Sequence, residues 1–590
     1  MRSIDFHASR RVLLRVFVFF LYVASTAASG DWRNIRNGLE IPSEGYADQP
    51  YVVITKDGDW LCTLTTGRGR EGDVGQHVVA AISSDKGRTW SELIDIEPAD
   101  GPEASWAMPL VTPSGRVYAF YDYNGNNVRT LPNGKKIRAD MLGWYCYRYS
   151  DDSGRTWSER FRLPVRVTAC DRANDWSGAV QIMWGIGKPI SFDGSLMFAF
   201  TKLGRYMLDN GEGWFFRSDN ILTEREVSKI RWEMLPEGQH GVRNEQFGSV
   251  QEEHNVVALS NGDLYCMYRT TTGHPVHCYS RDGGRRWSKP EIATYAPGGQ
   301  PFKHPRACPR IWRAKNGRFL FWFHNHGGKD YKERNPAWVC GGIEKDGLIY
   351  WSQPEILLYD PDPETRISYP DLIEQDGRYW VTETQKEIAR VHEIDRGLFE
   401  GLWRQAEVNE PAHYGMEMLL RKSGLGPGRQ MDMVSLPALD AGGGFSIGLW
   451  MRCDRIDSDT VLLDSRDDRG RGICIRTTEV ATARIEISDG TGTAAWDCDP
   501  GAFDKKGLHH VVFIVDGGPK IISVVADGVL CDGGEHRQYG WGRFRADLGN
   551  VSGKTLRIGG SPQVSLEGLR IYDRAMRTSE AIGNFRAGPP

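Results

Sequence analysis

Two groups of residues have types and spacing that could do chemistry. The first is "GRGREG", residues 67–72, which matches the glycine pattern of a nucleotide-binding loop. It leads into "HVVAAISSD", which is typical of a strand, whereas a bound pyrophosphate needs the N-terminus of a helix. The match therefore does not predict nucleotide binding.

Three histidines form the second group. His324 and His326 are two residues apart, which places both on one face of a strand, and His304 is the third. Imidazoles bind zinc, but no supporting acid is placed beside them, and the 11 cysteines contain no CxxC pair. We predict no metal and no cofactor, and a structural or substrate-bonding role for the histidines.

A repeat indicates the elements that must hold any site. The pattern Ser-x-Asp-x-Gly-x-x-Trp, here called the Asp box, occurs three times, at residues 83–90, 150–157 and 280–287. Asp85 and Asp152 are 67 residues apart, and Asp152 and Asp282 are 130 apart. Asp219 and Asp346 mark two further units at the same pitch. Repeats of this kind indicate a recurring structural unit.

Each Asp box is expected to be structural. Its Ser and Asp would bond backbone N–H groups and lock a hairpin turn, and its Trp would pack between strands of its own blade. Short apolar runs such as "VYAFYDYNG" and "LYCMYRTTTG" predict about four strands per unit, which is a propeller blade. A sixth unit fits residues 355–400, closed by a first strand near residues 32–40.

The predicted architecture is all-β, a six-bladed β-propeller followed by a β-sandwich. We place the propeller at residues 30–408, a linker or first strand at 409–436, and the sandwich at 437–590, where short strands continue without an Asp box. Residues 1–29 carry arginines, a short apolar run and small residues, which predicts a cleavable signal peptide rather than a membrane anchor. The mature protein is therefore expected to be secreted or periplasmic, without a membrane span.

The Asp boxes on such a propeller resemble the exo-sialidase (neuraminidase) superfamily over about residues 32–400. "EEHNVVALSNGDLYCMYR" resembles the strand pair that carries a catalytic Glu and a binding Arg, which gives Glu253 and Arg269. "RNPAWVCGGIEKDG" gives a second Arg, Arg334, and "SYPDLIEQDGRYWVTE" gives Tyr369 and Glu383. The C-terminal part resembles laminin-G-like, concanavalin-type jelly rolls, through "FSIGLW" and "LHHVVFIVDGG".

The resemblance implies a retaining glycoside hydrolysis with a neutral nucleophile. Tyr369 would attack with Glu253 as its base, because a carboxylate nucleophile would repel an acidic sugar. Asp73, after "TTGRGRE", would protonate the leaving oxygen. Arg269 and Arg334 would hold the anionic group, and Glu383 would orient a neighbouring cation.

One element departs from the family. The first blade should carry an Arg that completes a three-Arg clamp, but the sequence has Asp48 and Gln49 before Pro50. Arg68 resembles another binding Arg of the family, and Arg306, in "KHPRACPR", is the best replacement for the missing one.

We therefore expect a secreted exo-glycosidase of sialidase type with a glycan or glycoconjugate substrate. Two alternatives remain open, a glycoside hydrolase of the same fold with a non-sialic substrate, and an inactive carbohydrate-binding propeller. A net charge of -4 argues against a nucleic-acid partner. The sequence carries no signal for an oligomeric state.

Overall fold

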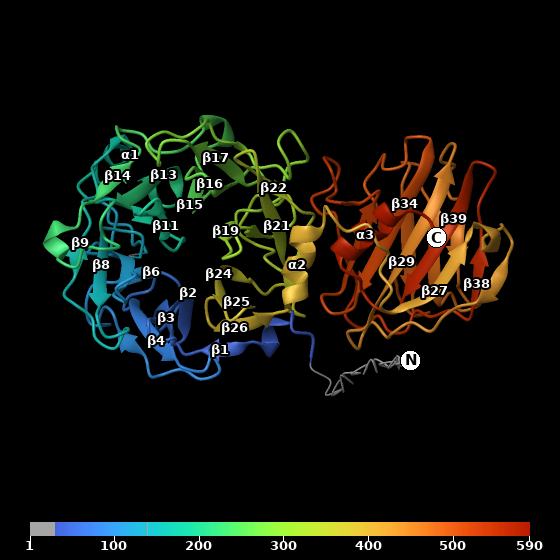
Figure 1. Cartoon of the computed structure of the whole chain (residues 1–590), viewed down its shortest axis with the longest axis horizontal. Helices are drawn as coiled ribbons and strands as arrows, with labels where there is room; N and C mark the ends of the chain where they lie inside the picture. The colour runs from blue at the N-terminus through green and yellow to red at the C-terminus, as the bar shows by residue number, and fades with distance from the viewer. Residues whose placement is uncertain (1–29, 139) are drawn as a thin grey trace, which may run out of the picture.

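The structure is a computed structural model that describes residues 30–138 and 140–590. The predicted signal peptide lies outside these residues. Strands dominate both lobes of the molecule (Figure 1), and three α-helices occur in the described part, α1 (Ala169–Ala173), α2 (Arg396–Arg404) and α3 (Thr578–Ala587). None of the helices in these two ranges is long and apolar enough to cross a membrane.

Within the described residues, strands β1 to β26 form six antiparallel sheets around a common centre (Figure 1). We number these sheets as blades 1 to 6. Blade 1 contains β2 (Tyr46–Ile54), β3 (Trp60–Gly67), β4 (His77–Ser83) and β5 (Ile94–Asp95). Blade 2 contains β6 (Ala104–Val111), β7 (Val117–Tyr123), β8 (Trp144–Ser150) and β9 (Phe161–Arg162). Blade 3 contains β10 (Met183–Trp184), β12 (Ser195–Arg205), β13 (Asp209–Ser218) and β14 (Glu233–Leu235), with β11 (Ile190–Phe192) paired to β12.

The other three blades follow the same order from the centre outward. Blade 4 contains β15 (Gln251–Ala258), β16 (Leu264–Thr270), β17 (Val276–Ser280) and β18 (Glu291–Ile292). Blade 5 contains β19 (Arg310–Arg313), β20 (Phe319–Phe323), β21 (Ala337–Lys345) and β22 (Leu348–Trp351), with β23 (Glu355–Leu358) paired to β21. Blade 6 contains β24 (Ser368–Gln375), β25 (Arg378–Thr384), β26 (Ala389–Ile394) and β1 (Leu39–Ile41).

The first strand of the chain closes the ring. Leu39 of β1 pairs with Val391 of β26, so the last blade is completed by the N-terminal end of the domain. This closure ties together two segments that are far apart in sequence and pairs the outer edge of β26 with β1, which becomes the edge strand of blade 6. The predicted all-β propeller followed by a sandwich is confirmed.

The Asp boxes lie at equivalent turns, between the third and fourth strands of blades 1, 2 and 4. In blade 2, Asp152 accepts hydrogen bonds from the backbone N–H (2.9 Å) and the hydroxyl (2.6 Å) of Thr156, and Ser150 accepts from the N–H of Gly154 at 2.8 Å. The boxes in blades 1 and 4 repeat the backbone contacts. The expected locking of the turn is thus observed.

Two expectations about the boxes were wrong in detail. In blade 3, Asn220 rather than Asp219 occupies the box position, since it bonds Ser218 and accepts from the N–H of Arg231. The box Trp packs between blades and not within its own. Trp287 of blade 4 stacks on Phe215 of blade 3, with ring centroids 4.4 Å apart.

The C-terminal lobe is a sandwich of two antiparallel sheets. One sheet has the order β27 (Met416–Arg421), β39 (Val564–Tyr572), β29 (Gly444–Cys453), β34 (Gly507–Asp516), β35 (Ile521–Ala526) and β36 (Val529–Leu530), with β37 (Gly542–Arg543) paired to β35. The other has the order β28 (Gln430–Asp432), β38 (Thr555–Ile558), β30 (Val461–Asp464), β31 (Gly472–Thr477), β32 (Ala483–Ser488) and β33 (Thr493–Asp497). The main apolar core of the lobe lies between these sheets.

The first of these sheets is buried on both faces. Along β34, Val511, Phe513 and Val515 face the core of the sandwich, whereas Val512 and Ile514 join an apolar cluster with strands of blades 4 and 5. This is the period-two alternation of a strand, with both sides apolar. The two domains therefore share an apolar cluster on the face of this sheet opposite the sandwich core, and do not form loosely tethered modules.

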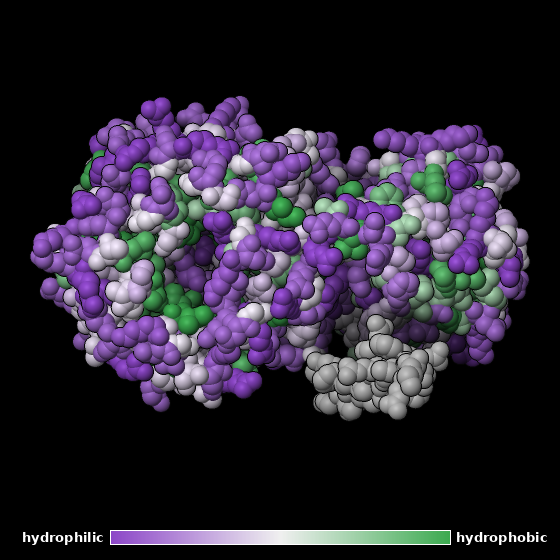
Figure 2. Space-filling view, viewed as in Figure 1, coloured by the Kyte–Doolittle hydropathy of each residue, from purple (hydrophilic) through white to green (hydrophobic). Residues whose placement is uncertain are grey.

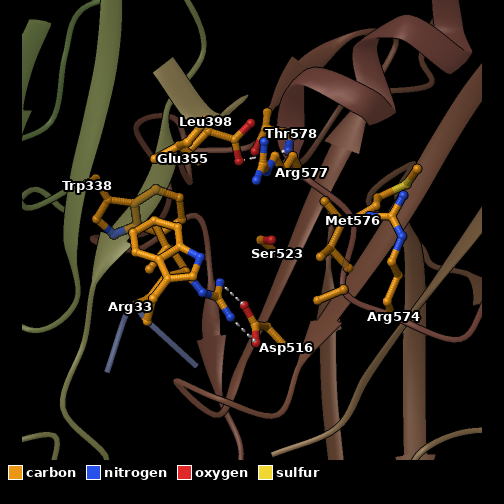
Figure 3. A pocket seen from close by; sticks show the side chains of 14 residues that line it. Arg33, Trp338, Glu355, Leu398, Asp516, Ser523, Arg574, Met576, Arg577 and Thr578 are labelled. Carbon is orange, nitrogen blue, oxygen red and sulfur yellow. Dashed lines mark hydrogen bonds and ion pairs between the residues drawn. The ribbon is translucent and has the colours of Figure 1, made fainter. Parts of the chain in front are cut away.

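Charged contacts surround a cavity at the same junction (Figure 3). Arg33 forms an ion pair with Asp516 at 2.6 Å, and the carboxylate of Glu355 accepts the N–H groups of Thr578 and Ser579 at the start of α3, each at 2.9 Å. A carboxylate at this end of a helix satisfies free N–H groups and the helix dipole. These contacts fix the orientation of the second domain on the first.

Candidate active site

The inner strands of four blades share a backbone irregularity, a β-bulge. Strands β2, β6, β15 and β24 each carry a bulge, and each bulge contains one residue with a positive φ. These residues are Gln49 (50°), Trp106 (61°), Glu253 (57°) and Tyr369 (47°). Such a conformation costs about 1–3 kcal/mol per residue and is found at functional sites. Trp106 and Tyr369 meet in one apolar cluster although they come from blades 2 and 6.

A pocket of about 520 Å³ opens beside these strands. Figure 2 shows the propeller hollowed near the centre of its ring. Half of the residues lining the pocket are basic, namely Arg138, Arg269, Arg306, Arg334, Arg366 and Lys386. Tyr369 and Glu71 also line it. A concave site with this charge excess is suited to an anionic ligand.

Glu253 and Tyr369 are in direct contact. The Tyr369 hydroxyl donates to Oε1 of Glu253 at 2.8 Å, and both side chains are buried. Burial raises the pKa of Glu253 despite the nearby arginines, and burial together with Glu253 raises the pKa of Tyr369 well above its ordinary value. The tyrosine is therefore neutral, with a carboxylate of increased basicity positioned to take its proton.

Both glutamates of the "EEH" stretch face the same side, contrary to the alternation expected of a strand. Arg269 contacts Glu253 at 2.6 Å and Glu252 at 2.7 Å, and Arg306 contacts Glu252 at 2.6 Å. The bulge between Glu252 and Asn255 removes the alternation. Glu252 thus connects two arginines of the pocket, a role that the sequence did not indicate.

Arg334 is a buried cation without a carboxylate. Its side chain is 6% exposed and donates to the hydroxyl of Ser368 (2.8 Å) and to the carbonyls of Tyr331 and Arg306. It makes no ion pair with any residue of the described part of the chain. An unpaired buried charge is costly, so this guanidinium is poised for an anion from outside the protein.

A lysine stands near the position of the missing first Arg. Nζ of Lys386, in the turn between β25 and β26, lies 2.6 Å from the buried carboxylate of Asp48 and 3.2 Å from Glu71. The same ammonium is 4.2 Å from the ring centroid of Tyr369. Sequence reasoning missed Lys386, since no family motif marks it. The acidic Asp48 in the first blade was the available signal that a cation had to lie opposite.

The loop after β3 brings Glu71 to the pocket and leaves Asp73 and Arg68 outside its lining. Asp73 is exposed and accepts the backbone N–H of Arg70 at 2.7 Å, so it closes its own turn. Glu71 contacts Lys386 and also Arg138, at 3.1 Å. Burial raises the pKa of Glu71, but these two cations outweigh it and hold the pKa below its ordinary value.

Glu383 is fully buried beside the pocket but does not line it. It contacts Nε2 of His392 at 3.1 Å and the side-chain amide of Gln385. It therefore supports the turn that carries Lys386 without touching the ammonium group.

The three histidines are buried and bond backbone carbonyls of the neighbouring loops. Within residues 30–138 and 140–590, no group of three or more His, Cys, Asp or Glu is arranged to hold a metal ion. The cysteines are buried and unpaired in this structure.

Comparisons with known proteins agree with this architecture. Residues 105–381 match the BNR repeat-like domain, and residues 429–582 match the concanavalin A-like lectin/glucanases superfamily. Among solved structures, the chain is similar to a sialidase of Trypanosoma rangeli in complex with 2,3-difluorosialic acid, at 13% identity over 94% of this chain and 96% of that one, with a TM-score of 0.44.

Two further solved structures are similar. A protein of unknown function from Dyadobacter fermentans has 16% identity over 60% of this chain and 98% of its own, with a TM-score of 0.44. A Hadza microbial sialidase has 18% identity over 59% of this chain and 66% of its own, with a TM-score of 0.43. The chain carries a BNR repeat-like domain followed by a concanavalin A-like domain.

Proposed function

We propose that the protein is a retaining glycoside hydrolase of sialidase type that removes a terminal acidic sugar, with sialic acid as the first candidate. The observation that carries this proposal is Arg334, a buried cation without a carboxylate, beside a buried pair of Tyr369 and Glu253. The first feature supports an anionic sugar. The second supports a neutral nucleophile with its own base.

The proposed reaction begins when the anionic group of the sugar binds Arg334 and the cations around it. Glu253 takes the proton of the Tyr369 hydroxyl as that oxygen attacks the anomeric carbon. The leaving oxygen takes a proton from Glu71, the acid that lines the pocket, in place of the expected Asp73. Water then releases the sugar from Tyr369, with Glu71 as its base and Glu253 returning the proton.

Glu71 is ionised in the empty pocket, because Lys386 and Arg138 hold its pKa low. This is the form needed to activate water. To act as an acid it must first take up a proton, and an anion that binds Lys386 and Arg138 would weaken the contacts that oppose this. Substrate binding therefore favours the acidic form.

The test is turnover of a panel of aryl glycosides, sialosides included, by the purified protein and by Arg334→Met. We expect turnover of an acidic glycoside, and a rise in KM of roughly ten- to hundredfold in the variant, the range for a lost charged hydrogen bond of about 1.5–3 kcal/mol. Turnover of a neutral glycoside alone, with unchanged KM in the variant, would replace the acidic substrate with a neutral one. Binding of glycans without turnover would identify an inactive carbohydrate-binding propeller.

A further inference from the structure

The segment that carries Arg334 has no regular secondary structure of its own. It runs from residue 324 to 336, between β20 and β21, and contributes both Tyr331 and Arg334 to the pocket. Connections of this length inside a compact domain are uncommon and are usually functional. Something outside the segment must hold Arg334 in place.

Two histidines of the segment itself tie its beginning to its end. Nε2 of His326 donates to the carbonyl of Glu333 at 2.8 Å, next to Arg334, and Nδ1 of His324 lies 3.2 Å from the carbonyl of Pro336. Burial lowers the pKa of both rings, so they are neutral and suited to fixed hydrogen bonds. The His-x-His motif thus supports the Arg334 segment.

The C-terminal domain holds the segment from outside. The N–H of Gly327 donates to the carbonyl of Gln538 at 2.9 Å, and the side-chain amide of Gln538 donates to Glu333 at 3.1 Å. The hydroxyl of Tyr539 also bonds the carboxylate of Glu333, and its ring stacks on His326 with centroids 4.9 Å apart. Glu333, directly before Arg334, is therefore bound by two side chains of the other domain.

Both ends of the segment are tied to the same C-terminal strip. The indole of Trp541 donates to the carbonyl of Asn325 at 2.9 Å, and the guanidinium of Arg543 donates to the carbonyl of Asn335. Trp541 is also part of the apolar cluster shared by the two domains. The strip is therefore anchored to the propeller by both polar and apolar contacts.

We infer that residues 538–543 of the C-terminal domain are a positioning element for Arg334, so that the anion-binding side of the pocket is complete only when this domain is docked. The inference rests on the proposed function for its effect on substrate binding, but not for its effect on the order of the segment. The four side chains of the strip act through Glu333 and the backbone and touch no substrate.

The experiment compares Tyr539→Phe and the double variant Gln538→Ala/Tyr539→Ala with the parent protein. Amide hydrogen exchange is followed over residues 326–336. We expect faster exchange there in the double variant and a smaller change in Tyr539→Phe, which keeps the ring and loses the hydroxyl. Tyr414→Ala is the matched control, because Tyr414 is an exposed tyrosine directly before β27, the first strand of the C-terminal lobe. Unchanged exchange in the double variant would overturn the inference.

A kinetic readout separates positioning from general stability. For an acidic aryl glycoside, we expect the double variant to raise KM at least roughly tenfold with kcat within about twofold, because ground-state and transition-state binding weaken together. Glu333→Gln combined with Tyr539→Phe should give a change in KM smaller than the product of the two single changes. The inference is contradicted if the KM of Gln538→Ala/Tyr539→Ala equals that of the parent. It is also contradicted if the KM change of Glu333→Gln combined with Tyr539→Phe equals the product of the two single changes.

The two proposals can fail separately. A protein that turns over no glycoside refutes the proposed hydrolysis, while the exchange measurement still decides whether residues 538–543 order the Arg334 segment. An intact thermal transition in Tyr539→Phe establishes that any change in exchange is local.

Discussion

The two sides of the pocket are built in different ways. On the side of blades 4 to 6, Glu253, Arg269 and Tyr369 come from strands, and the hydroxyl of Tyr369 is 2.8 Å from Glu253. On the side of blade 1, Glu71 comes from a loop, and Lys386 comes from a turn of blade 6 that reaches across to Asp48. The first side keeps the residues that the family resemblance implies. On the second side, Asp48 stands where the family resemblance implies an Arg, and the cation beside it comes from another blade.

The comparison separates residues fixed by sheet register from residues placed by loops and turns. Strand residues near the axis are fixed by sheet register, so they keep their relation to one another across a propeller. Loop and turn residues can exchange roles, provided that buried charges remain paired. Four predictions follow from this contrast, beginning with the largest effect.

Breaking the strand side should be the most damaging change. Tyr369→Phe removes the proposed nucleophile, and Glu253→Gln removes its base, so each should lower kcat by on the order of 10²–10⁴-fold or more. The double variant should be little worse than the worse single variant, because the two residues act as one unit. Steady-state kinetics on an acidic aryl glycoside measure this. Independent, multiplicative losses would separate Tyr369 from Glu253 and reject the pair.

On the loop side, Glu71→Gln should lower kcat by about 10²–10⁴-fold for a glycoside with a poor leaving group. The loss should be much smaller for an activated aryl glycoside, whose leaving oxygen needs no acid. Asp73→Asn should change kcat less than about twofold, because Asp73 only closes its own turn. If Asp73→Asn shows the large loss and Glu71→Gln does not, the acid is Asp73, as the family resemblance implies.

Removing the recruited cation should cost both stability and binding. Lys386→Met leaves the buried Asp48 unpaired, which should destabilise the protein by about 3–5 kcal/mol, and it should also raise KM. Asp48→Asn in the same chain should restore most of the stability but not the binding. Urea unfolding and KM are the two measurements.

A matched lysine controls for this loss. Lys188 pairs with the buried Asp371 at 2.7 Å between blades, away from the pocket lining. Lys188→Met should lose similar stability with KM within about twofold of the parent. Equal changes in KM for the two lysine variants would show that Lys386 has no specific role in substrate binding.

The smallest effect on the protein is expected from changes in the Asp box turns, which lie away from the pocket. Asp152→Ala should destabilise the propeller by about 1 kcal/mol, the scale of a lost hydrogen-bonded turn, without altering KM. Burial raises the pKa of Asp152, but bonds from Thr156 and Ser150 outweigh this and lower it to about 2, from 3.8. A carboxylate whose pKa is lowered by folding stabilises the fold fully at pH values above its ordinary pKa. This stabilisation is lost as the pH falls toward about 2.

The difference in thermal midpoint between the parent and Asp152→Ala should therefore be full near neutral pH and shrink between about pH 4 and pH 2. A difference that grows in acid would mean that Asp152 does not act through its ionised form. Asp219→Ala should have less effect at any pH, because Asn220 occupies the equivalent box position in blade 3.

The sequence by itself determined the architecture. The spacing of Asp85, Asp152 and Asp282 gave the unit, and the turns they lock recur at one place in their blades, because the contacts of an Asp box are local and are made within a few residues. Strand patterning separated the sandwich from the propeller. The family resemblance, and not strand patterning, implied Glu253, Arg269, Arg334 and Tyr369, and their order along the chain follows the order of blades 4 to 6.

The tertiary structure decided the side-chain orientations and the long-range contacts that local sequence patterns do not specify. The period-two alternation of a regular strand would place Glu252 and Glu253 on opposite faces, but a bulge turns both toward Arg269. Lys386 and Asp48 are 338 residues apart and meet only because the ring closes between blades 6 and 1. The support of Arg334 by Tyr539 likewise depends on the docked domain. Charge pairing and docking act between distant segments, so their outcome is set by the folded geometry and not by spacing along the chain.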